Sequence, residues 1–260
     1  MYDLLPIWFI ALGFALLIFL TSEAACWAAK KNKVAPAEVP FDVALAPAFT
    51  LVALLLGFAF SMALGRYEMR GRLVIQEASS LRRLIWLTDG LEPQTARSLS
   101  AQIQDYVQAR ADFAGADAEP QRRKLARERS AGLQQQMWQV ALEASKRDRG
   151  STVLPLVLST LSEVLSVSAE QDAAFADYIP PAVILMLVFI SILSAGLMGF
   201  RLGCQGGSGA LAGGMLAFML ALILGTIIDL DQPQRGFIRV NLEPLGGLAQ
   251  DVARVAGKTR

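Results

Sequence analysis

Long apolar runs and polar stretches alternate along the chain in a two-and-two arrangement. Apolar runs cover residues 4–20 and 43–64 before a polar stretch at 66–178, and residues 179–200 and 208–228 after it. A helix rises about 1.5 Å per residue and the hydrocarbon core of a bilayer is about 30 Å thick, so roughly 20 apolar residues span it. We therefore predict four membrane-spanning helices, two on each side of an insert.

The polar insert has helical periodicity throughout. Its apolar residues recur every three or four positions in segments that start near Leu73, Leu99, Leu125 and Leu154, and these segments break at Asp89-Gly90, near Gly115, near Gly150 and at Pro180-Pro181. The first segment continues directly from the second span. Each segment has one apolar face that must pack on a neighbour, which predicts an antiparallel helical bundle standing on the second and third spans.

The expected organisation is an all-α membrane protein with four parts. These are a hairpin of spans at 1–65, a cytosolic helical domain at 66–178, a second hairpin at 179–230 and a cytosolic tail at 231–260. The tail contains a short amphipathic helix with Leu245, Leu248, Val252 and Val255 on one face. Two interpretations of this helix remain open, because it could lie on the inner membrane surface or pack on the insert.

The positions of lysine and arginine predict the orientation, since cytoplasmic flanks collect positive charge. The second span is followed by Arg66, Arg70, Arg72, Arg82 and Arg83, and the fourth by Arg235 and Arg239, against Lys30, Lys31, Lys33 and Arg201 on the other side. We expect both termini and the insert in the cytoplasm. The basic run Arg122-Arg123-Lys124 is flanked by Glu119 and Glu128, so we interpret it as a solvated helix face and expect no nucleic-acid partner.

The chemistry-bearing residues argue against an enzyme. The chain has no histidine, which removes His-based metal sites and triads, and it has no P-loop and no nucleophile paired with a base. We expect no catalytic residues, no metal and no cofactor. The two cysteines, Cys26 and Cys204, fall on the predicted outer side, where they either form a disulfide in an oxidising compartment or remain unrelated thiols.

The second span carries a stripe of small, mildly polar residues. The stripe consists of Thr50, Ala53, Leu54, Gly57, Ser61 and Leu64, whereas Phe49, Phe58 and Phe60 project elsewhere. A pore-lining face with bulky apolar constrictions has this composition. An ordinary helix interface built from small residues has it too. In the fourth span, Gly209 and Gly213 form a row of small residues, and we predict that it packs closely on Ser194, Gly196 and Gly199 of the third span.

Two acidic residues follow the fourth span directly. Asp229 and Asp231 stand at a helix C-terminus, where the macrodipole favours a cation, so another group must stabilise them. The candidates are the arginines Arg66 and Arg70 after the second span, and Arg235 and Arg239 just downstream. We predict an inner-mouth charge network, which is either a structural clamp or an acidic ring that shapes ion access.

Three stretches resemble the bestrophin-like domain family of bacterial membrane proteins. They are Leu55-Leu56-Gly57-Phe58-Ala59-Phe60-Ser61-Met62-Ala63 with Arg66-Tyr67 and Gln76-Glu77-Ala78, then Leu161-Ser162-Glu163 with Ile179-Pro180-Pro181, and finally Asp229-Leu230-Asp231-Gln232-Pro233 with Arg235-Gly236-Phe237-Ile238-Arg239-Val240. The chain departs from the family pattern at Ser162, where an asparagine is usual.

The resemblance implies a function that the residues alone do not. True bestrophins are pentameric anion channels whose pore is lined by the second of four membrane helices, above a helical cytosolic vestibule. By analogy we expect a homo-oligomer, a pentamer, that lies in the bacterial inner membrane in contact with lipids and conducts inorganic anions through a pore lined by its second span. The alternative is a non-transporting scaffold or signalling protein whose cytosolic helices dock a partner.

Overall fold

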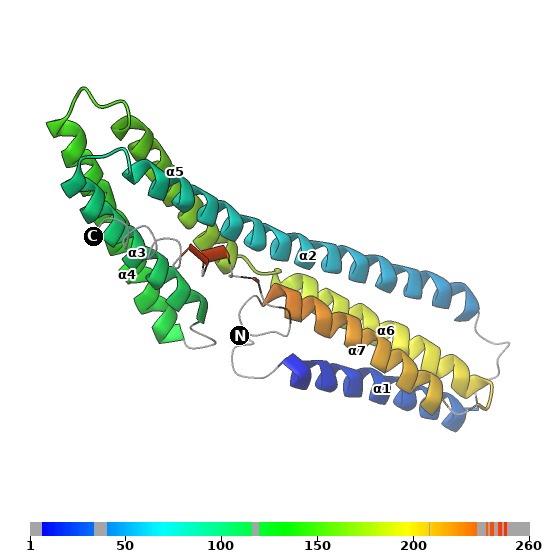
Figure 1. The fold of residues 1–260 in the computed structure, drawn as a ribbon. Coiled ribbons are helices and arrows are strands. Elements are labelled where there is room, and N and C mark those ends of the chain that lie inside the picture. Colours follow the sequence, from blue (N-terminus) through cyan, green and yellow to red (C-terminus); the bar gives the residue numbers. More distant parts are fainter. Residues whose placement is uncertain are drawn as a thin grey trace. The chain divides into compact units, whose positions relative to one another are not determined.

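The computed structural model describes residues 7–33, 41–115, 120–207, 209–232, 238, 240–241, 244–245 and 247–248. Its helices are α1 Ile7–Lys31, α2 Phe41–Thr88, α3 Pro93–Gly115, α4 Pro120–Arg147, α5 Leu154–Ala176, α6 Pro181–Cys204 and α7 Ala210–Asp231 (Figure 1). The chain divides into two compact units. We call Met1–Arg66 with Tyr178–Ile238 the membrane unit, and Tyr67–Asp177 with Arg239–Arg260 the insert unit.

Within the part of the chain that the structure describes, four segments are long and apolar enough to cross a membrane. They are Trp8–Lys31, Val43–Thr88, Leu154–Cys204 and Ala210–Asp231, and they overlap the four predicted spans, which correspond to α1, α2, α6 and α7. The prediction of four membrane helices is confirmed. The second span also continues as one helix into the insert, as expected, because α2 runs without a break to Thr88.

The helix ends follow the local sequence. The α2 helix stops before Asp89-Gly90, and α3 begins at Pro93, where the missing N–H of proline costs nothing. Pro181 likewise opens α6, with Pro180 as the residue that caps it. The proline pair therefore marks the boundary between α5 and α6, which agrees with the sequence prediction.

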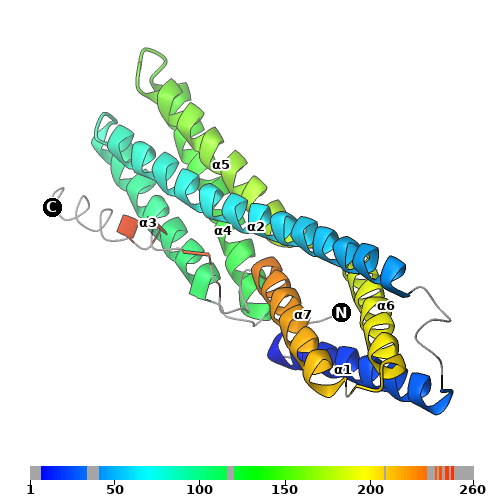
Figure 2. The ribbon, with the colours of Figure 1, turned by 90° about the vertical axis from the view of Figure 1, so that its right-hand side faces the viewer.

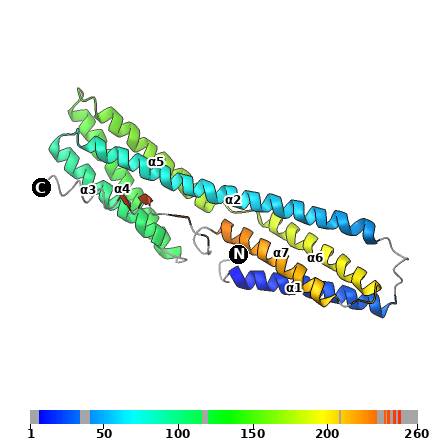
Figure 3. The same cartoon turned by 45° about the vertical axis from the view of Figure 1, so that its right-hand side comes forward.

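In the membrane unit, α1 packs against both α6 and α7 (Figure 3). The contact with α6 is made through glycines: a methyl group added to Gly199 would overlap the backbone of Ser22, and one added to Gly203 would overlap the carbonyl of Cys26. Gly213 of α7 faces the hydroxyl of Ser22. The expected pairing of these small residues between the third and fourth spans is wrong, because the α6 and α7 glycines both lie against α1.

The insert unit has one apolar core to which every helix contributes. Leu81 from α2, Ile103 from α3, Met137 from α4 and Leu161 from α5 are fully buried within it; α3 and α4 lie side by side (Figure 2). Burial of a side chain of this size contributes about 1.5–3 kcal/mol.

The tail helix adds to the same core. Leu245 and Leu248 are both buried in it, together with Val240. Of the two interpretations of the tail, packing on the insert therefore holds for these residues. Val252 and Val255, from the same predicted face, lie outside the described residues.

Candidate functional site

The predicted pore-lining stripe is the open face of α2 in the membrane unit. Thr50, Ala53, Gly57, Ser61 and Leu64 are all exposed, and a Cβ built on Gly57 would meet nothing within 4 Å. The opposite face of the helix is closed. Its residues recur at helical spacing and are buried: Val52, Leu56, Ala59 and Ala63. The stripe is thus available to line a pore or to meet another chain.

Bulky apolar residues flank this stripe. Phe58 and Phe60, two of the predicted constriction residues, are exposed, whereas Phe49 is half-buried. Leu51 and Met62 lie near Phe58 on the same side and are exposed as well. A narrow small-residue face bordered by a broad apolar one is suited to contact with lipid or with a second copy of the helix.

Arg70, predicted at the inner mouth, is fully buried in the insert unit. Its Nε donates to the carbonyl oxygen of Ala174 over 3.0 Å, and its Nη2 donates to that of Asp177 over 2.7 Å. These carbonyls belong to the C-terminal end of α5, where the helix dipole favours a cation and the last carbonyls need donors. Arg70 therefore caps α5 from α2.

Asp229 and Asp231 accept hydrogen bonds from backbone N–H groups in the membrane unit. Both carboxylate oxygens of Asp231 lie 3.1 Å from the amide nitrogen of Ile179, just before α6, and Asp229 Oδ2 accepts from the N–H of Ile238 over 2.9 Å. These contacts tie the end of α7 to the start of α6 and to the tail. Arg66 is half-buried, and Arg235 and Arg239 lie outside the described residues, so the full charge network stays a prediction.

A buried polar network joins all four helices of the insert unit. Glu77 of α2 accepts a hydrogen bond from the Tyr106 hydroxyl over 2.6 Å and pairs with Arg110 Nε at 3.0 Å. Arg110 also donates to the Gln171 side chain of α5. From α4, Gln134 Nε2 donates to the Tyr106 oxygen over 3.1 Å and to Ser168 Oγ over 2.9 Å.

This environment fixes the protonation of two members. Burial, together with the adjacent Glu77 carboxylate, raises the pKa of the Tyr106 phenol, which therefore stays neutral. Burial is the largest single influence and acts to lower the pKa of Arg110, but attraction to Glu77, Tyr106 and Asp172 together outweighs it, so the pKa of Arg110 is raised. The network thus places a neutral phenol and a cation beside Glu77, and the same cation also pairs with Asp172, whose Oδ1 lies 3.6 Å from Arg110 Nη1.

The family model for the bestrophin-like domain matches residues 40–245, which include α2 through α7. This chain belongs to the bestrophin-like domain family. The expectation drawn from the three sequence motifs is confirmed.

Solved structures agree with this bestrophin-like assignment at the level of the fold. Two point variants of a bacterial bestrophin homologue from Klebsiella pneumoniae match with TM-scores of 0.73 and 0.69 at 14% and 16% identity, covering 95% and 96% of this chain and 98% of the other. A crystal structure described as a membrane protein matches with a TM-score of 0.73 at 15% identity, covering 95% of this chain and 98% of the other. No curated protein matches in sequence.

The cysteines of this bestrophin-like chain are free thiols in the structure. Cys26 is buried with its Sγ 3.8 Å from the carbonyl oxygen of Gly207, and Cys204 is half-buried. Their pairing stays a prediction. Within the described ranges, no group of three or more histidine, cysteine, aspartate or glutamate residues is placed to hold a metal ion.

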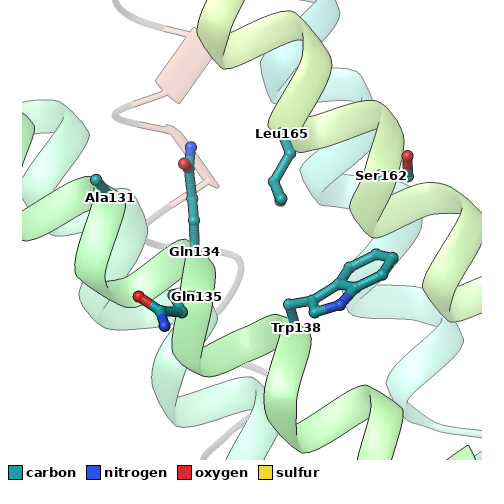
Figure 4. A pocket seen from close by; sticks show the side chains of 6 residues that line it. All are labelled: Ala131, Gln134, Gln135, Trp138, Ser162 and Leu165. Atoms are coloured by element: carbon teal, nitrogen blue, oxygen red, sulfur yellow. The ribbon is translucent and has the colours of Figure 1, made fainter.

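A groove of about 380 Å³ opens between α4 and α5 in the insert unit of this bestrophin-like protein (Figure 4). It is lined by Ala131, Gln134, Gln135, Trp138, Ser162 and Leu165. Gln134 is the member of the buried network that reaches this groove. Ser162, where the family usually has asparagine, is exposed on the α5 side.

Sequence reasoning missed the Glu77 network, although a signal was present. Glu77 follows Val74 by three positions and precedes Leu81 by four, so a charge lies on the apolar face of α2. Arg110 follows Val107 by three positions on α3 in the same way. Opposite charges on two apolar faces of one bundle indicate a buried ion pair.

Proposed function

We propose that this chain is the subunit of an oligomeric ion channel of the bacterial inner membrane, with the exposed stripe of α2 lining the pore. The observation that carries the proposal is the open, small-residue face of α2, with no atom within 4 Å of the position that a Gly57 Cβ would occupy. Four helices enclose little space by themselves, so a pore along this face requires a ring of subunits.

Membership of the bestrophin-like family supports the remaining features of the proposal. By analogy with bestrophins, the ring is a pentamer, the permeant ions are anions and the insert unit forms a cytosolic vestibule. The charge distribution along the chain supports cytoplasmic termini. The chain performs no catalysis in this proposal.

The alternative is a non-transporting scaffold that docks a cytosolic partner. Its supporting observation is a set of exposed apolar side chains on the insert unit, including Trp86, which is 69% exposed, with Ile75 and Leu125. Such side chains are typical of contact surfaces. The same residues also suit contacts between subunits of a ring, so the two functions must be separated by experiment.

The deciding experiment measures subunit number and ion flux on one preparation. The mass of the complex is measured in nanodiscs, and chloride efflux is measured after reconstitution into liposomes. A defined ring with selective efflux is expected. A monomer or dimer in silent liposomes would reject the channel and direct attention to the exposed side chains of the insert unit.

A substitution at Gly57 tests the pore face itself. Because the site is open, Gly57→Phe is expected to fold and assemble while it narrows the pore and strongly reduces efflux. The matched control is Gly13→Phe in α1, an exposed glycine that also has nothing within 4 Å of its Cβ position. Loss of assembly with Gly57→Phe alone would instead assign the stripe to helix packing.

Substitution of the two aspartates at the end of α7 tests whether they influence ion access at the proposed inner mouth of the pore. Asp229→Asn with Asp231→Asn is expected to shift ion selectivity or gating if the acids shape ion access. An unchanged current–voltage relation would leave them as clamps that hold the N–H groups of Ile179 and Ile238.

A further inference from the structure

An apolar groove of about 350 Å³ lies between α1 and α6 in the membrane unit. It is lined by Thr21, Ile192, Leu193, Gly196, Leu197 and Phe200. The one hydroxyl in this lining is already used, because Thr21 Oγ1 donates to the carbonyl oxygen of Leu17 over 2.8 Å. The groove therefore offers an occupant an apolar surface and no hydrogen-bond donor in need of a partner.

Gly196 keeps the groove open. A Cβ built there would lie 3.7 Å from Thr21 Cγ2, an ordinary van der Waals distance, whereas Gly199 one turn later is in backbone contact with Ser22. The two glycines of α6 therefore have different structural roles. Gly199 brings α1 and α6 together, and Gly196 leaves space beside that contact.

The surroundings decide what can fill this space. Both helices are long and apolar enough to cross a membrane, so an apolar groove on their surface would face the hydrocarbon of the bilayer. Its volume is within the range of known ligand pockets. In a bilayer, the apolar group available to occupy such a groove is a lipid acyl chain.

Basic residues lie beyond one end of the groove. Gly196 faces Thr21, Gly199 faces Ser22 and Gly203 faces Cys26 and Ala29, so α1 and α6 run in the same direction. They end with Lys30 and Lys31 on α1 and Arg201 on α6. Trp27 is exposed, and tryptophan is a residue type enriched at membrane interfaces; the Lys31 Nζ lies 4.7 Å from the centre of its ring.

We propose that this groove binds an acyl chain of an anionic phospholipid whose headgroup phosphate is held by the two lysines that end α1. Two adjacent cations complement a negatively charged headgroup better than a zwitterionic one. The assignment needs no ion conduction and is tested without it.

The test measures lipid retained by the purified protein. Protein reconstituted in equimolar phosphatidylglycerol and phosphatidylcholine is extracted in detergent and weighed by native mass spectrometry. Phosphatidylglycerol is expected to remain bound in preference to phosphatidylcholine. Gly196→Leu fills the groove and is expected to lose the retained lipid, whereas Gly13→Leu adds the same bulk at an open position of α1 and is expected to keep it.

A second variant tests the headgroup contact without touching the groove. Lys30→Gln with Lys31→Gln alters exposed positions and is expected to lower the preference for phosphatidylglycerol by about fivefold per lysine. Equal retention of the two lipids by the unaltered protein would overturn the assignment. Full retention of phosphatidylglycerol by the Gly196→Leu variant would also overturn it. A change in subunit number caused by Gly196→Leu would instead show that the groove is a contact between chains, and would overturn the assignment too.

Discussion

The membrane unit and the insert unit are each stabilised by a different kind of internal contact. In the membrane unit, α1 and α6 approach until a methyl group at Gly199 or Gly203 would overlap the α1 backbone, and buried hydroxyls such as Ser22 and Ser194 have no hydrogen-bond partner among the described residues. In the insert unit, a large-residue core surrounds a hydrogen-bonded charge network. Lipid gives helices no hydrophobic reason to associate, so contact distance matters most there.

In the insert unit, large apolar side chains are buried together in one core, and the polar contacts have a different role. The apolar core is large enough to hold four helices together, but apolar contacts are non-directional. Directional contacts pair Glu77, Tyr106, Arg110 and Gln171 in this arrangement, and a shift of one helix would leave a buried polar group without a partner. The network therefore specifies how the helices are set against one another within the unit.

The largest expected effect comes from breaking this network. Arg110→Met leaves the Glu77 carboxylate buried without its cation, and we expect the insert unit to lose about 3–5 kcal/mol of stability. Amide hydrogen exchange measured by mass spectrometry should become faster in the insert-unit part of α2 and in α3. Exchange in α1 should not change.

The double variant is the matched control for the Arg110 prediction. Glu77→Leu combined with Arg110→Met removes both charges, and replacement of a buried pair by apolar residues is often close to neutral. Much of the lost protection should therefore return. A single variant as stable as the original protein would show that the pair does not hold the unit together.

The next effect concerns the membrane unit and uses one substitution at two sites. Gly199→Ala places a methyl group against the backbone of Ser22, and we expect a cost of about 1–3 kcal/mol from overpacking. Gly13→Ala adds the same group in open space within α1 and should stabilise that helix by about 0.5–1 kcal/mol. Thermal unfolding in detergent should therefore shift in opposite directions, and shifts of one sign would contradict close packing.

The contrast between the units explains what could be predicted from the sequence. Spans, helix limits and the continuous α2 follow from local signals, namely the lengths of apolar runs and breaks such as Asp89-Gly90 and Pro180-Pro181. The partner of a glycine-rich face does not, because small residues fit any close neighbour. For this reason the sequence predicts that the fourth span packs on the third, whereas Gly199 of α6 and Gly213 of α7 both face α1.

The candidate site shows the same limit. Helical spacing was sufficient to place Thr50, Gly57 and Ser61 on one face of α2, and the structure adds that this face is open. Spacing could not show that Arg70 caps α5 or that Asp231 holds the N–H of Ile179, since these partners are distant in sequence. Tertiary contacts of single charges require the fold.

A smaller effect concerns pH and again belongs to the insert unit. Because the folded protein raises the pKa of Tyr106, the folded state keeps a proton that the unfolded state releases above about pH 10. The free energy of unfolding therefore does not depend on Tyr106 ionisation below that pH. Above it, the free energy of unfolding should fall by about 1.4 kcal/mol per pH unit. Tyr106→Phe should be less stable at neutral pH but should lack this fall, as measured by exchange of α3 at matched exchange times. If stability fell equally with pH in the original protein and in Tyr106→Phe, the pKa of Tyr106 would not be raised by the buried network.

The smallest effect comes from an ion pair on the surface of the same unit. Arg83 Nη1 and Glu163 Oε2 lie 2.9 Å apart, but their side chains are 55% and 35% exposed, so solvent screens the attraction. We expect Arg83→Gln to cost about 0.2–1 kcal/mol at low salt and less at 1 M salt, where the Debye length falls to about 3 Å. The Arg110 variant should keep nearly its full effect in the same buffer, because its partner is buried. If both variants responded equally to salt, the distinction between a buried network that sets helix arrangement and an exposed pair that does not would fail.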